Sequence, residues 1–275
     1  MADPDAEARR RAEVSGARRA VADARDLPES DGIVIASSTS THADLIELSL
    51  ARGVPVFVEK PMTSDPRQAR RLAESGQGRL FVMHKWRYHA GIEELRRIAE
   101  TGELGRPLGM HLRHTGWGTP HRDVDATWIL LPHGLSILLE VLGRVPPARH
   151  AFVERLNGAP VALSGVLGDD PWAVLEVSVR SPVKQREFRL HCERGVAWLS
   201  EGWSDQIFIA RGAGEAGGDA GQIESRRVPA ELPLLRELRT FLEHLSGGPP
   251  PRSSAEEGAL IVDRIGDLRR LAGLA

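Results

Sequence analysis

Cysteine is almost absent from this chain, which contains a single one, Cys192, among its 275 residues. One cysteine cannot form an intramolecular disulfide, so the sequence excludes a disulfide-stapled secreted domain and fits the reducing cytoplasm. We interpret Cys192 as a small buried apolar residue of a strand rather than as a catalytic thiol. Apolar runs of membrane-spanning length are also missing, and the polar first residues do not resemble a signal peptide. These absences predict a cytoplasmic protein with no membrane partner.

The chain also lacks a large excess of either charge. It contains 36 Lys and Arg residues and 38 Asp and Glu residues, so its net charge is −2. The basic residues are spread along the chain, which argues against a nucleic-acid partner. The arginines at positions 9–11 and 18–19 lie in an Ala/Glu/Arg-rich helical segment and indicate a solvated face. A chain of this length forms one large or two modest domains. The composition is typical of a globular enzyme.

The most informative segment that is present is Val54–Thr63, VPVFVEKPMT. Its apolar residues predict a buried strand that delivers Glu59 and Lys60 at its carboxyl end. Open α/β sheets bind ligands at that end of their strands, so Lys60 is a candidate site residue. Pro61 stops the strand and makes a cis peptide bond possible at a tight turn. The tripeptide alone is equally compatible with a solvated strand end.

The neighbouring segments favour the site interpretation. Residues 31–36, DGIVIA, form another short apolar run, followed by a hydroxyl-rich loop at 37–42 and a segment of helical periodicity. A helix at 65–75 and a strand at 79–83 follow the EKP strand. Strands that alternate with helices of this length predict parallel βαβ units and a doubly wound sheet.

The second half of the sequence predicts strands first and helices afterwards. Six predicted strands show partial alternation of apolar and polar residues, at 149–154, 161–167, 172–179, 186–191, 196–200 and 206–211. They predict a mostly antiparallel sheet that is covered on one face, with a glycine-rich hairpin tip at 212–221. Apolar residues at helical spacing predict helices at 232–245 and 255–274 that pack on the first domain. The expected fold is α/β, with an incomplete Rossmann-type sheet in domain 1–84 and an α+β domain at 85–275.

The order strand, SSTSTH loop, helix, strand, EKP, helix and strand resembles the glucose–fructose oxidoreductase/inositol dehydrogenase (Gfo/Idh/MocA) family. The resemblance continues through nearly the whole chain, in the segments His84–His89, Thr101–Pro107, Trp128–Gly143, Pro233–Gly247 and Arg252–Leu271. It implies an oxidoreductase that uses NAD or NADP and acts on a sugar, cyclitol or related polyol. It also implies a homodimer or homotetramer formed through the exposed face of the carboxyl-terminal sheet.

The resemblance places the chemistry on two residues, Lys60 and His133. An imidazole titrates near neutral pH, so His133 can accept the hydroxyl proton as hydride leaves, or return it in the reverse reaction. Lys60 would hold the substrate oxygen and stabilise developing negative charge. Without the resemblance, a histidine among apolar residues is more often structural.

Further contacts follow from the same resemblance. It implies cofactor contacts by Asp3, Ser38, Thr39, His42, Glu59, Lys60 and Arg87, and substrate contacts by Lys60, Tyr88, Trp117, Arg122 and His133. A carboxylate at Asp3 would repel a 2′-phosphate and so slightly favours NAD. Two of these assignments have a structural alternative. The hydroxyl-rich loop could instead cap the amino terminus of the following helix, and Arg87 could instead pair with a surface carboxylate.

A second group of polar residues predicts a lid. His114, Trp117, His121 and Arg122 lie in a Gly/Pro-containing segment, which we interpret as a loop that covers the substrate. Their clustering does not predict a metal site, because the segment lacks a carboxylate–histidine ligand spacing.

The sequence also departs from the family pattern. Ile129 stands where the family often has an aspartate one turn before the histidine, and Gly134 stands where another acidic residue frequently follows it. These departures, together with the missing glycine-rich turn, favour the alternative of a catalytically silent scaffold. The resemblance implies a further alternative, a redox-assisted hydrolase or lyase, because some members of the family use transient oxidation to cleave a neighbouring bond.

A glycine-rich GxGxxG turn does not precede Asp3, so the 275-residue chain is expected to bind nicotinamide nucleotides weakly or not at all. We expect the recorded start to lie inside a longer reading frame, with a decayed remnant as the alternative. In-frame upstream DNA should then encode roughly 20–30 residues with a strand and a GxGxxG-like turn.

Overall fold

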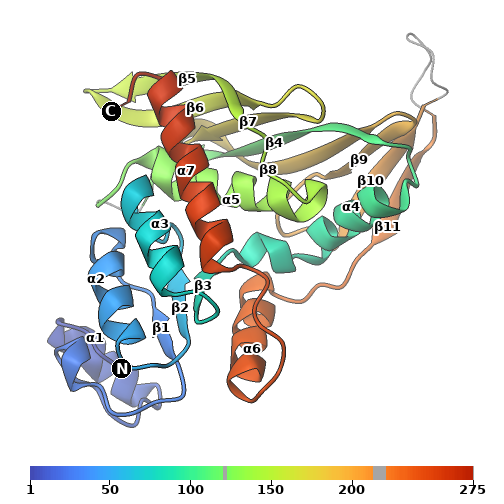
Figure 1. Ribbon diagram of the computed structural model, residues 1–275. Coiled ribbons are helices and arrows are strands. Elements are labelled where there is room, and N and C mark those ends of the chain that lie inside the picture. Colours follow the sequence, from blue (N-terminus) through green and yellow to red (C-terminus); the bar gives the residue numbers. More distant parts are fainter. Residues whose placement is uncertain (120–122, 213–220, 275) are drawn as a thin grey trace.

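Two β-sheets organise the protein, whose computed structural model describes residues 1–119, 123–212 and 221–274 (Figure 1). The smaller sheet contains β1 (Ile33–Ile35), β2 (Val56–Glu59) and β3 (Leu80–Met83), and all its neighbouring strands are parallel. Helices α2 (Thr39–Leu50) and α3 (Pro66–Ser75) connect these strands. The parallel βαβ arrangement expected from the sequence is confirmed.

Local sequence signals explain where these elements begin and end. The side chain of Asp65 caps α3 by accepting hydrogen bonds from the backbone amides of Arg67 and Gln68, and Pro66 occupies the first helical position. Pro61 ends the segment after β2, and the Lys60–Pro61 peptide bond is cis. The carboxyl end of β2 therefore lies where the EKP motif predicted it.

The first residues of the chain lie beside this sheet. They form α1 (Ala6–Val14), the short 3₁₀ helix η1 (Ala24–Asp26) and an isolated parallel bridge between Ala2 and Val21. Helix α1 buries none of its residues, as expected for an Ala/Glu/Arg-rich solvated segment.

The larger sheet fills the second part of the chain. Its eight strands are β4 (Pro107–Trp117), β5 (Ala148–Leu156), β6 (Ala159–Leu167), β7 (Trp172–Ser178), β8 (Arg180–Cys192), β9 (Gly195–Leu199), β10 (Gln206–Arg211) and β11 (Ile223–Arg227). Their order is β11-β10-β9-β8-β4-β7-β6-β5, and only β4 and β7 pair in parallel. The expected, mostly antiparallel sheet is confirmed, and α4 (Ala90–Thr101) and α5 (Ala126–Leu142) lie along one of its faces (Figure 1).

One expectation for this region is wrong. His114 and Trp117 do not lie in a lid loop but on β4, between β8 and β7 in the middle of the sheet. The strand is hard to recognise because Gly109, His111 and Arg113 interrupt its apolar residues. Gly109 is required by packing, since a Cβ there would lie 2.3 Å from the ring of Trp172.

The last two helices cover both faces of the small sheet. Helix α6 (Pro233–Leu245) packs Phe241 on Phe57, with ring centroids 4.9 Å apart. Helix α7 (Ala255–Leu271) packs on the opposite face, where Gly258 lies against Val82. The expectation that both helices pack on the first domain is confirmed.

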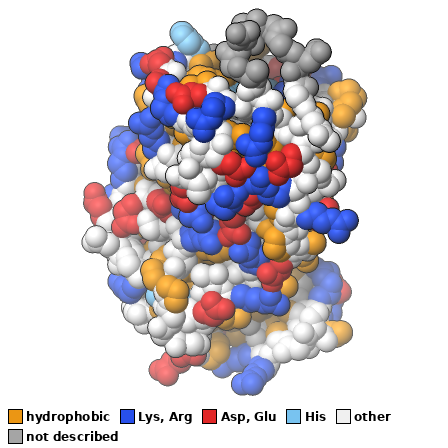
Figure 2. Space-filling view, turned by 90° about the vertical axis from the view of Figure 1, so that its right-hand side faces the viewer, with side chains coloured by type: hydrophobic (Ala, Val, Ile, Leu, Met, Phe, Trp, Pro, Cys, Tyr) orange, Lys and Arg blue, Asp and Glu red, His pale blue; other side chains and the backbone are white. Residues whose placement is uncertain are grey.

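The molecular surface carries intermixed charges. Figure 2 shows acidic and basic side chains interspersed on the face it presents. Salt bridges of this kind join α4 and the turn after it to β11, such as those of Arg226 with Glu94 and Glu103, both at 2.8 Å. None of the described helices is long and apolar enough to cross a membrane.

Candidate active site

A cavity of about 500 Å³ lies where the carboxyl ends of β1 and β2 meet the large sheet. The small sheet contributes Glu59 and Lys60 to its lining, α5 contributes His133, and β4 and β8 contribute His114 and Arg186. The cavity is therefore built from segments that lie far apart in the sequence.

Lys60 lies at the end of β2 and is largely enclosed. Its Nζ donates one long hydrogen bond, 3.4 Å, to the backbone carbonyl of Ile129 on α5. Burial lowers the pKa of Lys60, and the nearby Glu59 carboxylate opposes this shift. The ammonium group thus has a weak protein contact that a substrate oxygen can replace.

His133 lies on α5 on the opposite side of the cavity, and it is buried. Its ring stacks on that of His114, with centroids 5.3 Å apart, and its Nδ1 has no partner among the described residues. Burial lowers the pKa of His133 well below its usual value, and the charge of Lys60 adds to this effect. The ring is therefore neutral at physiological pH and has a nitrogen lone pair that can accept a proton.

Two further buried polar groups, His84 and Glu237, were missed by sequence reasoning. Neither ring nitrogen of His84 and neither carboxyl oxygen of Glu237 makes a hydrogen bond of normal geometry within the described chain. Burial lowers the pKa of His84 to about 3 and raises that of Glu237 well above its usual value. Glu237 was detectable, because it lies on the apolar face of α6 between Leu234 and Phe241.

Five of the residues assigned by resemblance line this cavity: Thr39, His42, Glu59, Lys60 and His133. Among them, His42 joins two loops. Its Nδ1 lies 2.9 Å from the carbonyl oxygen of Pro61 and its Nε2 lies 3.1 Å from that of Ser37. His42 therefore fixes the loop after β1 against the EKP turn.

Arg87 and Tyr88 lie outside the cavity lining, so the structure does not bring them together with Lys60 and His133 as expected. Arg87 forms ion pairs with Glu140 at 2.8 Å and with Glu257 at 2.6 Å. The Tyr88 hydroxyl accepts a hydrogen bond of 2.9 Å from the backbone amide of Arg252. Both residues sit in the 3₁₀ helix η2 (Lys85–Tyr88) and connect it to the carboxyl-terminal helices.

The remaining assigned residues also lie elsewhere. Asp3 accepts a hydrogen bond from the amide of Asp5, and the Ser38 side chain makes no capping bond to α2. Trp117 is 71% exposed and lies outside the lining. Arg122, like His121, falls outside the described residues.

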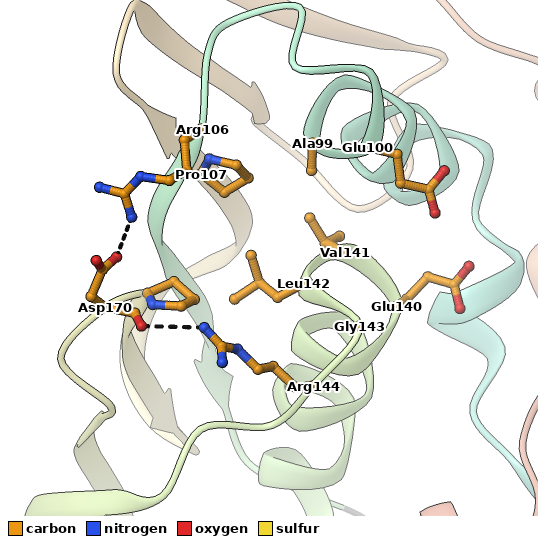
Figure 3. A pocket seen from close by; sticks show the side chains of 11 residues that line it. Ala99, Glu100, Arg106, Pro107, Glu140, Val141, Leu142, Gly143, Arg144 and Asp170 are labelled. Carbon is orange, nitrogen blue, oxygen red and sulfur yellow. Dashed lines mark hydrogen bonds and ion pairs between the residues drawn. The ribbon is translucent and has the colours of Figure 1, made fainter.

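A second cavity, of about 520 Å³, lies between the ends of α4 and α5 and the start of β4 (Figure 3). Arg106 forms an ion pair with Asp170 at 2.6 Å, and Arg144 donates to the Asp170 carbonyl at 3.2 Å. These groups satisfy one another, whereas the Lys60 cavity holds unpartnered polar groups. No group of three His, Cys, Asp or Glu side chains in the described part of the chain could hold a metal ion. The Lys60 cavity is the candidate active site.

Residues 1–82 match the model of a family described as an oxidoreductase family with an NAD-binding Rossmann fold, Gfo/Idh/MocA. Over these residues the chain resembles this family. The chain is 34% identical over 149 residues to inositol 2-dehydrogenase of Streptomyces avermitilis, a match that covers 48% of this chain and 43% of the relative. It is 31% identical over 174 residues to inositol 2-dehydrogenase of Pseudomonas fluorescens, covering 61% of this chain and 51% of the relative. The matches thus span about half the length of these relatives.

Solved structures share the fold of this chain. An oxidoreductase from Agrobacterium radiobacter gives a TM-score of 0.84 at 16% identity, over 99% of this chain and 87% of that chain. UDP-N-acetylglucosamine 3-dehydrogenase from Acidithiobacillus ferrooxidans gives a TM-score of 0.83 at 22% identity, over 98% of this chain and 88% of that chain. At these identities the likeness shows the α/β fold with its large mixed sheet.

Proposed function

We propose that this protein is an oxidoreductase that transfers hydride between a nicotinamide cofactor and a sugar, cyclitol or related polyol. The observation that carries this proposal is the meeting of Lys60 and His133 in one cavity, from β2 and from α5. The relatives support it, since two are inositol 2-dehydrogenases and one structural neighbour is a UDP-N-acetylglucosamine 3-dehydrogenase.

The residues around the cavity fit a nicotinamide. Small residues, Ala36 and Ser37, follow β1 at the carboxyl edge of the sheet, where open α/β folds bind ligands. One structural neighbour was solved with NAD⁺ and another, a 3-ketoreductase from Actinomadura kijaniata, with NADP. For this chain we favour NAD, because the carboxylate of Asp3 would repel a 2′-phosphate. When bound, the nicotinamide supplies the hydride acceptor or donor.

The two proposed catalytic residues have separate roles. In the oxidative direction the neutral ring of His133 takes the hydroxyl proton, as a general base. The ammonium group of Lys60 exchanges its long contact with Ile129 for the substrate oxygen and stabilises negative charge that develops there. In the reductive direction the same proton returns from His133.

Kinetics of Lys60→Ala and His133→Ala test the proposal, with both changes made in an active, amino-terminally extended protein that binds NADH. Loss of a positioned acid–base group is expected to lower kcat by about 10²–10⁴-fold. Nicotinamide affinity should stay nearly unchanged, and Lys60→Ala should also raise KM because it removes a contact with the substrate. The measurements are NADH absorbance with myo-inositol and a panel of polyols, and NADH fluorescence titration. His150→Ala, an exposed histidine on β5, is the control and should behave like the wild type. Full turnover by His133→Ala would remove the histidine from the mechanism.

A catalytically silent family member is the second candidate, and the surroundings of His133 favour it. Ile129 places no carboxylate beside the ring, whose Nδ1 is unpartnered within the described chain. Gly134 provides none either, and a Cβ at this position would lie 2.7 Å from Leu175 Cδ2, so that the leucine side chain would have to shift. NADH binding without turnover of any polyol in the same assay would support this candidate.

We further propose that the protein forms a homodimer or homotetramer through the outer face of the large sheet. Helices cover the inner face, whereas the outer face carries aromatic side chains, including Phe152, Trp172, Trp198 and Phe208. Phe152 is 75% exposed, which is unfavourable for an uncovered sheet.

A further inference from the structure

The candidate active site carries more positive than negative side chains. Lys60, Lys85 and Arg186 contribute cations to the described part of its lining, and Glu59 and Glu237 contribute carboxyl groups. None of these three cations forms a salt bridge with a carboxylate of the described residues, although most arginines elsewhere in the chain do. A neutral polyol would leave this excess of charge half-buried and without a counter-charge from the substrate.

Arg186 is held in a defined position on the substrate side of the cavity. It lies on β8 of the large sheet, opposite the strands of the small sheet. Its Nε donates to Nε2 of His114 at 3.3 Å, and its Cζ lies 5.7 Å from the ring centroid of Trp203. A planar guanidinium fixed in this way keeps its terminal N–H groups for a planar or tetrahedral anion.

We propose that Arg186 binds an anionic group of the substrate, a carboxylate or a phosphate, so that the substrate class is an acidic polyhydroxy compound rather than a neutral polyol. This inference rests on the proposed function and narrows it. The stacked pair of His114 and His133 places the anion one imidazole ring away from the proposed acid–base residue.

The electrostatics of the histidines agree with this arrangement. Burial lowers the pKa of His114 to about 3, and the charge of Arg186 is the next largest cause. Lys60 and Lys85 act in the same way on the pKa of His133. A bound anion would offset these positive charges and raise the pKa of His133, so the acidic substrate would improve the base that acts on it.

Isothermal calorimetry on the full chain, carried out both without and with NADH, tests the inference. The probes are D-gluconate, the neutral D-glucitol of the same carbon skeleton, and D-glucitol 6-phosphate. We expect an anionic probe to bind about 10-fold or more tightly than D-glucitol. Arg186→Gln should weaken binding of the anionic probe by about 10- to 100-fold, because a charge-assisted bidentate contact is lost. The affinity for D-glucitol should change by less than about 3-fold. Arg186→Lys should bind the anionic probe with an affinity between those of the wild type and Arg186→Gln, since lysine keeps the positive charge but cannot form a bidentate contact.

Arg180→Gln is the matched control. Arg180 lies on the same strand and also stacks on a tryptophan, with its Cζ 5.9 Å from the ring centroid of Trp117, but it does not line the cavity. Its replacement should leave all affinities unchanged.

The outcomes separate this inference from the proposed function. Preference for gluconate identifies a carboxylate, and preference for the 6-phosphate identifies a phosphate; either supports the anion site. If anion binding depends on Arg186 but no NADH forms from NAD⁺ in the absorbance assay, the anion site is supported and the proposed dehydrogenase function is contradicted. Binding of D-glucitol as tight as that of the anions, equal weakening of all probes by Arg186→Gln, or no binding of any probe would overturn the inference.

Discussion

Burial moves titratable residues in and beside the candidate site away from their charged forms. It lowers the pKa values of His84 and His114 to about 3, and it raises the pKa of Glu237 well above its usual value. A base and an acid are thus both neutral for the same physical reason, which is the cost of placing charge in a medium of low polarity. The site offers a substrate neutral proton carriers and fixed cations.

The raised pKa of Glu237 predicts a pH-dependent stability. In the unfolded chain this carboxyl ionises above its ordinary value of 4.5, whereas the folded protein holds the proton to higher pH. The unfolded state therefore binds fewer protons in that window, and stability falls as pH rises through it. Replacing Glu237 by Gln should remove this dependence. The stability advantage of Glu237→Gln should be near zero below pH 4.5 and should grow by about 1.4 kcal/mol per pH unit above it, until the folded pKa is reached.

Urea unfolding between about pH 5 and pH 8 measures this difference. Glu243→Gln serves as the control, since Glu243 is an exposed residue of the same helix, and it should show no comparable slope. A variant Glu237→Gln that loses stability relative to the wild type as pH rises would contradict the prediction.

At the scale of elements, buried ion pairs join η2 to α5 and α7. The side chains of Arg87 and Glu140 are 9% and 3% exposed, and Arg87 also donates to the carbonyl of Arg252 at 2.7 Å. Removing Arg87 leaves a buried carboxylate with weaker partners. Arg87→Met is therefore expected to lower the free energy of unfolding by about 3–5 kcal/mol.

Urea unfolding of two further variants makes the test specific. Arg70 pairs with Asp263 between α3 and α7 at 2.7 Å but is 57% exposed, so Arg70→Met should cost less than about 1 kcal/mol. The double change Arg87→Met with Glu140→Met should recover part of the loss, because it removes the stranded charge. Equal effects of Arg87→Met and Arg70→Met would show that burial does not matter here.

The sequence predicted those elements whose signals are local. The EKP strand and the helix of His133 are recognisable because their apolar residues and end residues lie next to one another in the chain. Arg186 and Glu237 were missed because only tertiary packing brings β8 and α6 to the same cavity. A weak signal existed for Arg186, which shares the inward-facing register of β8 with Phe188 and Leu190. For Arg87 the sequence left carboxylate pairing as an alternative, and only the tertiary structure identifies the partners as Glu140 and Glu257.

At the scale of the whole molecule, the uncovered sheet face predicts assembly. In a symmetric interface Phe152 would be buried once per copy, and burial of a phenylalanine contributes about 1.5–3 kcal/mol. Phe152→Asp should therefore weaken self-association by roughly 100-fold or more, as measured by light scattering after size-exclusion chromatography. Val14→Asp is the control, because Val14 is 91% exposed on α1, away from the sheet. A wild type that is monomeric at high concentration would defeat the proposal.

The position of α6 and α7 has a consequence for synthesis on the ribosome. The strands of the small sheet are synthesised early. Phe57 and Val82, on its two faces, remain uncovered until Phe241 of α6 and Gly258 of α7 pack on them. The backbone of Val82 also donates to Ser253 at 3.0 Å, a bond that closes most of the chain into one loop. Contacts between such distant residues form late, because the entropy of closing the loop must be overcome first. The nascent first domain therefore exposes apolar strands until the final helices leave the exit tunnel, and a chaperone that binds such strands would act on this protein during its translation.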